Sequence, residues 1–380
     1  MSKKNNLFKN NKSKLNRREE KLMIIRNRKL ILVAIHDCSV TGAPMLGLNM
    51  VKELKKNGYI VFVICLDKGE LYHQFKQNTF IIYTQTLKKI NIVIKILKYL
   101  GVNKVICNSV MTGEVTKIAE KYGMKVITLI HELPGTIISL GAKKKAINIT
   151  RHSHKIVFPN QFVKDKYISL FPVSKEKTII RPQGLFAKIA DYYDTETKIK
   201  KKQELGLGAN DKVVIGVGTG GKRKGIDLFL QVACTVHQYD KNISFMWVGE
   251  IESGYRWIIR QAKLNNIVLI QPTNHLEDYY RISDLYLLTS REDPFPSVVL
   301  DSIAYGMPVL GFKDAGGFIE LSQKYIRLVE YLNCDSMSNS VMEILDDTEF
   351  RNNVFENGKK YILKNFDFPQ YIRYLLYLLR

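Results

Sequence analysis

The chain has 380 residues, of which 46% are hydrophobic and 25% are charged, and its formal net charge is +22. This balance is typical of a globular protein long enough for two independent cores, which argues against a disordered or fibrous chain. The positive charge favours an anionic partner such as nucleic acid, a membrane surface or a polyphosphate-containing substrate. No stretch approaches the roughly 18 consecutive apolar residues that span a bilayer, so we expect no transmembrane helix.

The N-terminal segment 1–28 is strongly basic, rich in asparagine and without a sustained apolar period, so we expect a flexible tail. It lacks the central apolar run of a secretion signal, and export is not expected. The five cysteines are odd in number and scattered, which favours free thiols in a reducing cytoplasm. No Cys/His spacing typical of a metal site occurs. We therefore expect a cytoplasmic protein.

Between residues 29 and 185 the chain alternates strand-like apolar runs with helical patterns. One helix opens at Pro44, a residue suited to the first helical turn, and continues with the apolar period of Met45, Leu48 and Val51. Because this alternation is typical of a parallel sheet with crossover helices, we expect an N-terminal α/β domain. Its strands are predicted at 30–36, 59–65, 80–83, 104–107, 125–130 and 155–158, and further helices at 87–100 and 114–122.

A polar and charged stretch at 186–211 predicts a linker, and a second α/β domain is expected at 212–365. The final segment 366–380 predicts an aromatic and leucine-rich helix, which either caps the second domain or crosses back to the first. Two α/β domains with a cleft between them are therefore expected. The strands of the second domain are predicted at 213–217, 245–248, 267–270, 285–289 and 309–312.

The most informative stretch is residues 290–312, SREDPFPSVVLDSIAYGMPVLGF. Asp293 lies in a turn after a predicted strand, and Asp301 lies inside the short helix that follows. Gly306 ends this helix, and Pro308 prevents its continuation. Two carboxylates are thus expected at the carboxyl edge of a parallel sheet, where open α/β sheets bind their ligands.

A glycine-rich basic loop, VGTGGKRKG at 217–225, follows the first strand of the second domain. Its glycines allow backbone amides to approach an anion, and Lys222, Arg223 and Lys224 add positive charge beside a helix that starts near Ile226. The simpler alternative is a tight turn with solvated lysines. The acidic motif downstream in the same domain favours phosphate binding.

Acidic residues at a helix start can also stabilise the helix dipole without any ligand, and this explains Asp293 by itself. It does not explain the stiff turn Pro294-Phe295-Pro296 or the glycine pair at 316–317, which allows close backbone approach. The combination favours a ligand site.

These motifs resemble those of the retaining GT-B glycosyltransferases of family four, the group 1 enzymes that build bacterial polysaccharides. The family hallmark is an acid, seven residues, a second acid and then G-x-P-V, which is found here from Asp293 to Val309. RKGIDLF at 223–229 and AGGFIEL at 315–321 also match. The resemblance covers nearly all of the chain after residue 29. It implies two Rossmann-like domains facing each other across a cleft, with acceptor binding on the N-terminal side.

The resemblance implies roles for the acidic motif and the turn before its helix. Asp301 would hold the ribose hydroxyls of the donor nucleotide. Asp293, as a catalytic residue, would lie near the transferred sugar with the backbone amides of Phe295, Pro296 and Ser297. Both acids are usually glutamate in the family, so the shorter aspartates change the expected distances.

The basic loop would bind the donor diphosphate. Lys224 matches the family's lysine at this position, and Lys222 and Gly218 belong to the same donor-binding loop. The family's usual arginine, five residues before that lysine, is replaced by Thr219. The role of that arginine is therefore assigned to Arg223.

In the N-terminal domain, Gly42 lies where the family has a glycine loop that faces the donor phosphates and the acceptor. His131, in IHELPG, matches a family histidine that contacts the donor sugar near the reacting carbon, and it is the second predicted catalytic residue. His36 is interpreted as part of the loop structure. Asn108 and Ser109 are weaker candidates for the cleft.

The expected reaction transfers a sugar from a nucleotide-sugar to a hydroxyl of a growing glycan or lipid-linked acceptor, with retention, in cell-surface polysaccharide biosynthesis such as capsule or cell wall. No D-x-D occurs in the chain, so neither a bridging metal nor a cofactor beyond the donor co-substrate is expected. The alternatives are a sugar-nucleotide epimerase or hydrolase of the same fold, and a non-catalytic glycan- or nucleic-acid-binding protein. A nucleic-acid partner is not expected because no reading motif occurs.

An anionic membrane surface at the inner face of the plasma membrane is a further expected partner, because polybasic segments adsorb to anionic lipid. The tail 1–28, Lys143 to Lys145 and the lysine-flanked helix at 87–101 are the candidate contacts. For this helix, a crossover helix covering the sheet is the competing explanation.

Overall fold

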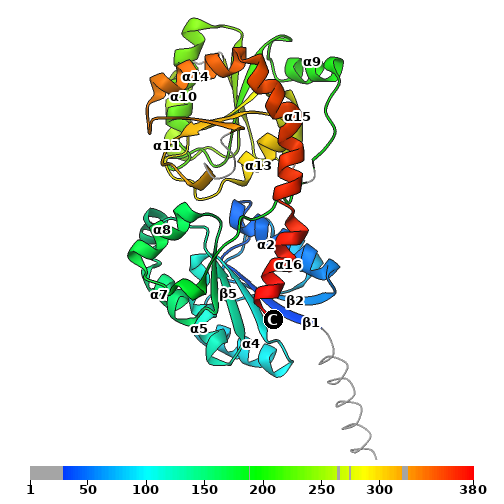
Figure 1. The fold of residues 1–380 in the computed structure, drawn as a ribbon, viewed down its shortest axis with the longest axis vertical. Coiled ribbons are helices and arrows are strands. Elements are labelled where there is room, and N and C mark those ends of the chain that lie inside the picture. Colours follow the sequence, from blue (N-terminus) through cyan, green and yellow to red (C-terminus); the bar gives the residue numbers. More distant parts are fainter. Residues whose placement is uncertain (1–28, 188, 263–265, 274, 319–323) are drawn as a thin grey trace, which may run out of the picture. The chain divides into compact units, whose positions relative to one another are not determined.

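The chain divides into two compact units (Figure 1). Unit 1 contains the residues up to Phe158, Lys166–Arg181 and Pro369–Arg380, and unit 2 contains Pro159–Asp165 and Pro182–Phe368. The tail predicted at 1–28 lies outside the described residues. The structure is a computed structural model that describes residues 29–187, 189–262, 266–273, 275–318 and 324–380.

Unit 1 is built on a seven-stranded parallel sheet with the order β3-β2-β1-β4-β5-β6-β7. The strands are β1 (Lys29–Ile35), β2 (Tyr59–Cys65), β3 (Phe80–Tyr83), β4 (Lys104–Asn108), β5 (Lys125–Leu129), β6 (Lys155–Phe158) and β7 (Thr178–Ile180). The helices are α2 (Gly42–Lys56), α3 (Tyr72–Asn78), α4 (Leu87–Tyr99), α5 (Gly113–Lys121), α6 (Pro134–Ser139) and α7 (Lys143–His152), with 3-10 turns η1 (Val110–Thr112) and η2 (Lys175–Lys177). Helix α8 (Gln161–Leu170) is divided: its residues up to Asp165 belong to unit 2 and those from Lys166 onward to unit 1.

Strand β1 shows why the apolar runs of this half are continuous rather than alternating. Six of its seven residues are buried, so both of its faces are covered. On one face, Leu30, Leu32 and Ala34 pack with Ile90 and Ile94 of α4. Burial on both faces is characteristic of parallel strands between helical layers, and the predicted α/β architecture is confirmed.

Unit 2 repeats this architecture with a six-stranded parallel sheet of order β10-β9-β8-β11-β12-β13. Trp247 of the fully buried strand β9 packs edge-on against Phe229 of α10, with 5.1 Å between ring centroids. The strands are β8 (Lys212–Val217), β9 (Ile243–Val248), β10 (Ile267–Ile270), β11 (Leu285–Leu288), β12 (Val309–Phe312) and β13 (Ile326–Val329). The helices are α9 (Thr195–Glu204), α10 (Ile226–Tyr239), α11 (Ser253–Ala262), α12 (Leu276–Ile282), α13 (Ser297–Ala304), α14 (Cys334–Asp346) and α15 (Thr348–Asn365).

The polar stretch predicted as a linker at 186–211 is part of unit 2 and contains α9. Asp194 caps this helix by accepting a hydrogen bond from the Thr197 amide at 2.7 Å. Lys198 pairs with Asp284 at 3.1 Å, and Lys202 is buried. Lysine-rich composition suggested a solvated connection, but these partners hold the segment against the unit.

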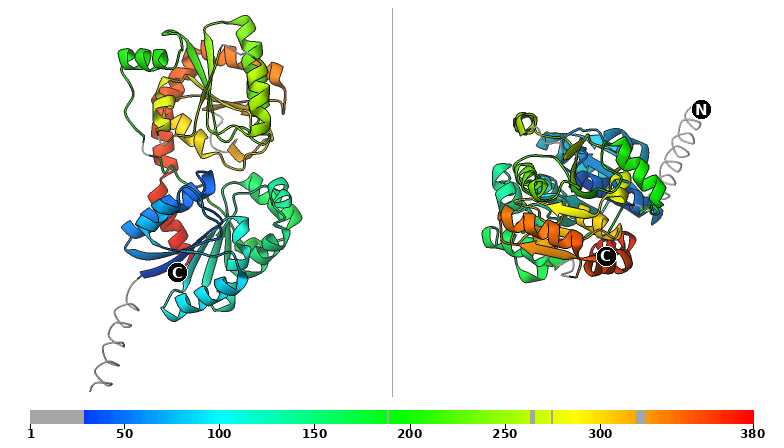
Figure 2. Two further views of the ribbon diagram at one scale, coloured as in Figure 1. Left: turned by 180° about the vertical axis from the view of Figure 1, so that it is seen from behind. Right: turned by 90° about the horizontal axis from the view of Figure 1, so that it is seen from above.

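The residues of the C-terminal helix α16 (Phe368–Leu378) from Pro369 onward belong to unit 1. Its apolar face is buried, with Ile372 and Leu375 fully inaccessible. Its polar face contacts Arg181, which donates to Gln370 at 3.3 Å. Figure 2 shows the same ribbon from two further directions.

Candidate active site

Both sheets reverse their strand order at one point. In unit 1, β1 lies between β2 and β4, and in unit 2, β8 lies between β9 and β11. Connections leaving β1 and β4, or β8 and β11, therefore diverge at the carboxyl ends of these strands and leave room for a ligand. The predicted site residues follow strands at or next to these two switch points.

In unit 2 the basic loop after β8 depends on glycine. Gly225 has φ 69°, and a Cβ there would lie 2.1 Å from the carbonyl oxygen of Thr289, which follows β11. Gly218 has φ 137°, and its carbonyl accepts a hydrogen bond from Trp247 Nε1 at 2.9 Å. Only glycine combines these conformations with such close approach, so the loop is held tightly against the end of β11.

The main charged contact of the site joins the two predicted motifs. Lys224 Nζ lies 2.5 Å from Asp293 Oδ2, and both side chains are largely buried. Ser290 Oγ donates to the same carboxylate oxygen at 3.2 Å. Burial by itself raises the pKa of Asp293, but Lys224 and then Arg223 outweigh it and hold the pKa below its ordinary value. Asp293 is therefore ionised at neutral pH.

A second ion pair fixes the backbone of the two motifs. Arg291 makes two hydrogen bonds to the carboxylate of Asp227, at 2.8 and 2.6 Å, and a third to the Lys222 carbonyl at 2.8 Å. The Arg291 amide also donates to the Arg223 carbonyl. Arg223 itself is exposed and donates to the Glu292 carbonyl at 3.0 Å. Arg291 thus anchors the backbone of Lys222 and Arg223, whose side chains are exposed.

The turn before α13 corrects one sequence expectation. Pro296 is the N-cap of this helix. Because proline has no backbone N–H, it cannot donate a hydrogen bond as Phe295 and Ser297 can. The amides of Phe295 and Ser297 have no hydrogen-bond acceptor within the described residues. Asn160 supports the turn by donating to the Pro294 carbonyl at 2.8 Å. The start of α13 therefore provides two backbone N–H donors without a protein acceptor among the described residues, those of Phe295 and Ser297, rather than three.

Asp301 lies apart from these contacts. It is the fifth residue of α13, its side chain is half-buried, and no hydrogen bond or ion pair to its carboxyl occurs within the described residues. Burial raises the pKa of Asp301 to about 7. An acid without a partner at a ligand-binding edge is a candidate for binding polar groups of a ligand.

The glycine pair at 316–317 has a structural role that differs from the one expected. A Cβ on Gly316 would lie 1.8 Å from the Asp293 carbonyl, and one on Gly317 would lie 1.8 Å from Nδ2 of Asn160. These glycines therefore allow the backbone to pack against the acidic turn itself. The close packing of Gly316 supports the backbone of Asp293.

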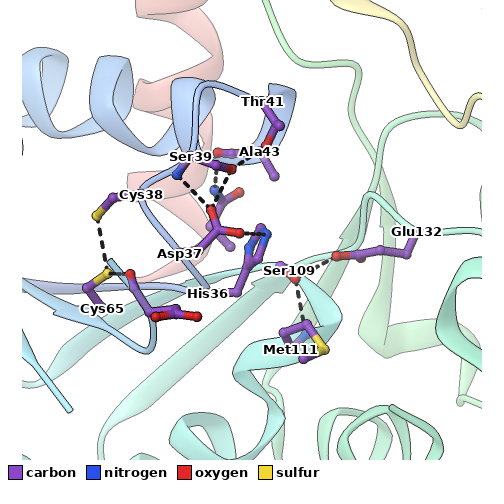
Figure 3. Close-up of polar contacts among 12 residues, drawn as sticks. His36, Asp37, Cys38, Ser39, Thr41, Ala43, Cys65, Ser109, Met111 and Glu132 are labelled. Atoms are coloured by element: carbon purple, nitrogen blue, oxygen red, sulfur yellow. Dashed lines mark hydrogen bonds and ion pairs between the residues drawn. The ribbon is translucent and has the colours of Figure 1, made fainter. Parts of the chain in front are cut away.

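In unit 1 the end of β1 carries a compact polar cluster (Figure 3). Asp37 accepts hydrogen bonds from the amide and hydroxyl of Ser39 at 3.0 and 2.8 Å, and it pairs with His36 at 3.3 Å. Burial opposes ionisation, yet His36 and Ser39 lower the pKa of Asp37 to about 2. Ser39 also bonds Thr41, the N-cap of α2, at 2.9 Å. The cluster therefore shapes the loop in which Gly42, exposed, begins α2.

His131 follows β5 and contacts the end of β4. Its Nε2 lies 2.9 Å from Oδ1 of Asn108, and its amide donates to Glu132 at 3.0 Å. Glu132 is buried and also accepts from the Ser109 hydroxyl at 2.5 Å (Figure 3). It accepts a further hydrogen bond from the Val110 amide. Glu132 was not among the residues predicted from the sequence. Its position directly after His131, within an apolar segment, was the available signal.

Of the predicted residues, unit 2 brings Lys224, Arg223 and Asp293 together and leaves Asp301 and Lys222 without side-chain contact to them. His131 and Gly42 lie in unit 1. The anchoring pair Asp227–Arg291 was not predicted, because an acid and a base 64 positions apart carry no local signal. No group of three or more His, Cys, Asp or Glu side chains suited to a metal occurs in the described part of the chain. Among the helices there, none is both long and apolar enough to cross a bilayer.

Family models match both halves of the chain. Residues 27–155 match the "Glycosyl-transferase family 4" model, and residues 197–361 match "Glycosyl transferases group 1". Together the models cover strands β1 to β5 of unit 1, all six strands of unit 2 and the motifs that follow them. The chain belongs to the group 1 glycosyltransferases. With its two Rossmann-like units, it has a fold of the GT-B class.

Individual relatives agree with this assignment. An alpha-galactosylglucosyldiacylglycerol synthase of Streptococcus pneumoniae is 27% identical over 170 residues, which is 42% of this chain and 44% of the relative. A lipopolysaccharide 1,2-N-acetylglucosaminetransferase of Salmonella typhimurium is 25% identical over 228 residues, 56% of this chain and 58% of the relative. The matched stretches thus span about half the length of these relatives.

The fold is also that of HepE from Anabaena, whose crystal structure was solved in complex with UDP-glucose. The TM-score is 0.77 at 18% sequence identity, over 92% of this chain and 99% of the other. At this identity the likeness establishes the fold.

Proposed function

We propose that this chain transfers a sugar from a nucleotide-sugar to a hydroxyl of a glycan or lipid-linked acceptor, with retention of the anomeric configuration. The observation that carries the proposal is the Lys224–Asp293 pair at the switch point of unit 2, with Arg223 exposed beside it. It combines a fixed cation, a second cation open to solvent and a carboxylate that stays ionised. The family membership and the donor named in the HepE complex support it.

In the proposed reaction, Arg223 and Lys224 stabilise the negative charge that develops on the leaving diphosphate. Lys222 and the Gly218 loop contribute further charge and backbone approach to the same phosphates. Because these cations supply the stabilising charge, we propose that transfer proceeds without a divalent metal. Activity that survives EDTA would support this part of the proposal.

The remaining predicted residues hold the sugar and the nucleoside. Asp301 accepts hydrogen bonds from the ribose hydroxyls, while Asp293 and the free amides of Phe295 and Ser297 bind the transferred sugar. In unit 1, His131 contacts the same sugar and the Gly42 loop borders the phosphates and the acceptor.

Arg223→Ala tests this proposal with little risk to folding, because the side chain is exposed. A thermal-shift screen of nucleotide-sugars first identifies a donor, and turnover is then measured with acceptor and with donor alone. We expect at least a ~100-fold loss of turnover, typical for removal of a group that stabilises transition-state charge. Arg256→Ala is the matched control, since exposed Arg256 also donates to a backbone carbonyl in unit 2, that of Ile251 at 2.9 Å.

Unchanged turnover in Arg223→Ala would refute the phosphate role. Equal turnover without acceptor would instead identify a hydrolase or epimerase. The anomeric configuration of the product, determined by NMR, tests retention separately.

We also propose that the protein acts at the cytoplasmic face of a membrane. Helix α4 covers the sheet with Ile90 and Ile94, as the crossover explanation requires, but it also exposes Ile92 and Ile96, at 48% and 53%, beside a series of lysines. Apolar side chains flanked by cations suit an anionic lipid surface. Lys143 to Lys145 at the start of α7 add to the basic surface.

Vesicle flotation with anionic lipid, at low and high salt, tests this association. Ile92→Ser/Ile96→Ser should lower the bound fraction several-fold. Leu363→Ser, at a position of similar exposure (51%) on α15, should not. Equal binding of both variants, or none by the wild type at low salt, would contradict the proposed surface.

A further inference from the structure

The His131 ring contacts an amide whose orientation is fixed by a third group. Asn108 ends β4, and its Nδ2 donates to the Ala43 carbonyl of α2 at 2.7 Å. Because a carbonyl oxygen can only accept, this contact assigns which end of the Asn108 amide is nitrogen. The other end, Oδ1, lies 2.9 Å from Nε2 of His131.

This arrangement determines the tautomer of the ring. An amide oxygen only accepts, so Nε2 of His131 carries the hydrogen, and the other ring nitrogen, Nδ1, is an acceptor while the ring is neutral. Nδ1 has no hydrogen-bond partner within the described residues.

The surroundings keep this ring neutral. Burial lowers the pKa of His131, Glu132 opposes this effect, and His36 adds to it. His36 faces the ring from the end of β1, where it is paired with Asp37. The ring is therefore uncharged near pH 7 and can present Nδ1 to a ligand.

Glu132 fixes the distance between the two strand ends that meet in this contact. Its carboxylate accepts hydrogen bonds from the His131 amide after β5 and from Ser109 and Val110 after β4. Ser109 has φ 131°, a backbone conformation that residues other than glycine rarely adopt. Such strain persists only where surrounding contacts enforce it, and here the carboxylate supplies them.

We infer that Asn108 is a positioning residue for His131: its oriented amide keeps the ring in the Nε2–H tautomer and leaves Nδ1 as an acceptor for a hydroxyl of the bound donor sugar. The sugar contact rests on the proposed function. The tautomer does not, because it is a property of the free protein.

The test combines NMR with kinetics on the full chain. Proton–nitrogen correlation spectra of protein labelled with ¹⁵N-histidine report the tautomer and pKa of each ring, and His131→Gln assigns the signal. We expect the Nε2–H tautomer in the wild type. In Asn108→Asp the carboxylate accepts the same bond but stabilises the imidazolium, so the pKa of His131 should rise by about one unit or more. The acidic limb of the kcat/KM profile should move to higher pH with it.

Asn108→Leu removes the acceptor, and both tautomers should then be populated. Asn49→Asp is the matched control, because Asn49 of α2 also donates its amide to a backbone carbonyl, that of Met45 at 2.9 Å, and should leave the His131 signal unchanged. An Nδ1–H tautomer in the wild type, or an unchanged pKa in Asn108→Asp, would overturn the inference. If no donor is turned over by the wild type, the proposed function fails while the spectra still decide the role of Asn108.

Discussion

The two switch points share a topology but satisfy their buried acids in different ways. In unit 2, the buried Asp293 is paired with Lys224, and the half-buried Asp227 with Arg291. In unit 1, Glu132 receives only neutral donors in the contacts described, two backbone amides and a serine hydroxyl. The unit 1 edge also has an ion pair, His36–Asp37. The contrast therefore concerns the two buried acids: Asp293 is balanced by a lysine, and Glu132 by neutral donors.

This difference corresponds to the proposed division of the substrate. Phosphates need fixed positive charge, which unit 2 supplies from a loop anchored by Arg291. A sugar is neutral and needs oriented donors and acceptors; in the proposal, His131 of unit 1, oriented by Asn108, is one such acceptor, in addition to the groups of unit 2. Two units of the same architecture can thus differ in the ligand groups that they bind. The difference lies in whether a cation or neutral donors stabilise the buried carboxylate of each unit.

The largest expected effect is the loss of the cation in unit 2. Lys224→Met leaves Asp293 buried without a counter-charge, and breaking a buried pair from one side costs about 3–5 kcal/mol. Denaturant unfolding should show this as a lower midpoint. Lys222→Met is the matched control, because Lys222 is an exposed neighbour in the same loop. Its midpoint should stay at the wild-type value.

The double variant Lys224→Met/Asp293→Asn removes both charges and should recover most of the lost stability while remaining inactive. A single Lys224→Met variant of wild-type stability would show that the pair is not desolvated.

A smaller effect is expected for the neutral network of unit 1. Glu132→Leu leaves the Ser109 hydroxyl and two backbone amides without their acceptor, which costs about 1–3 kcal/mol for each buried group not reached by water. Glu132→Gln retains an acceptor oxygen and should lose less than half as much. Glu114→Leu, at a half-buried acid of α5, is the control for removing a carboxylate from this unit, and its unfolding midpoint should change little.

If Glu132→Gln were as destabilised as Glu132→Leu, the negative charge rather than the acceptor would be what the network requires. That result would remove the contrast between the two switch points.

The sequence predicted the architecture well because parallel strands buried on both faces leave continuous apolar runs, as in β2, β6 and β12. It also located Asp293 and the basic loop, since their residue types follow strand ends directly. It did not indicate that Lys224 would bind Asp293, or that Asn108 would orient His131. Those contacts join residues 69 and 23 positions apart, and only the register of neighbouring strands brings them together.

The same limit applies to two further segments, whose tertiary partners the sequence did not indicate. Residues 186–211 have the composition of a linker, yet α9 is held by Asp284, whose position depends on β11. Gly316 was expected to face a ligand, but the close approach it permits is to the Asp293 carbonyl. In both cases the local sequence indicated a polar or flexible segment. It could not indicate the partner, Asp284 or the Asp293 carbonyl, because each lies far away in the sequence.

The smallest expected effect concerns Asp301, the acid of unit 2 that has no counter-charge. Burial raises its pKa to about 7, above the ordinary 3.8, so the folded protein binds a proton more tightly than the unfolded chain does. This contribution to stability is fully present below about pH 4 and is lost as the pH rises through 7. Asp301→Asn should therefore be more stable than the wild type at pH 8, by about 1 kcal/mol, since the half-buried carboxyl retains contact with solvent.

Nucleotide binding should show the opposite trend, because the ionised carboxylate is the better acceptor for ribose hydroxyls. The affinity of the wild type for a nucleoside diphosphate, measured by calorimetry, should rise between pH 6 and 8, and Asp301→Asn should bind more weakly and without this rise. Asp240→Asn, at a half-buried acid of the same unit, should follow the wild-type curve in both measurements. If Asp301→Asn gained stability at pH 8 and kept wild-type affinity, the acid would be buried as described but would not contact the nucleotide. Stability and nucleotide affinity should thus change in opposite directions with pH, and Asp301→Asn should abolish both changes. The paired Asp293 should cause no such changes, because Lys224 holds its pKa below the ordinary value and it stays ionised between pH 6 and 8.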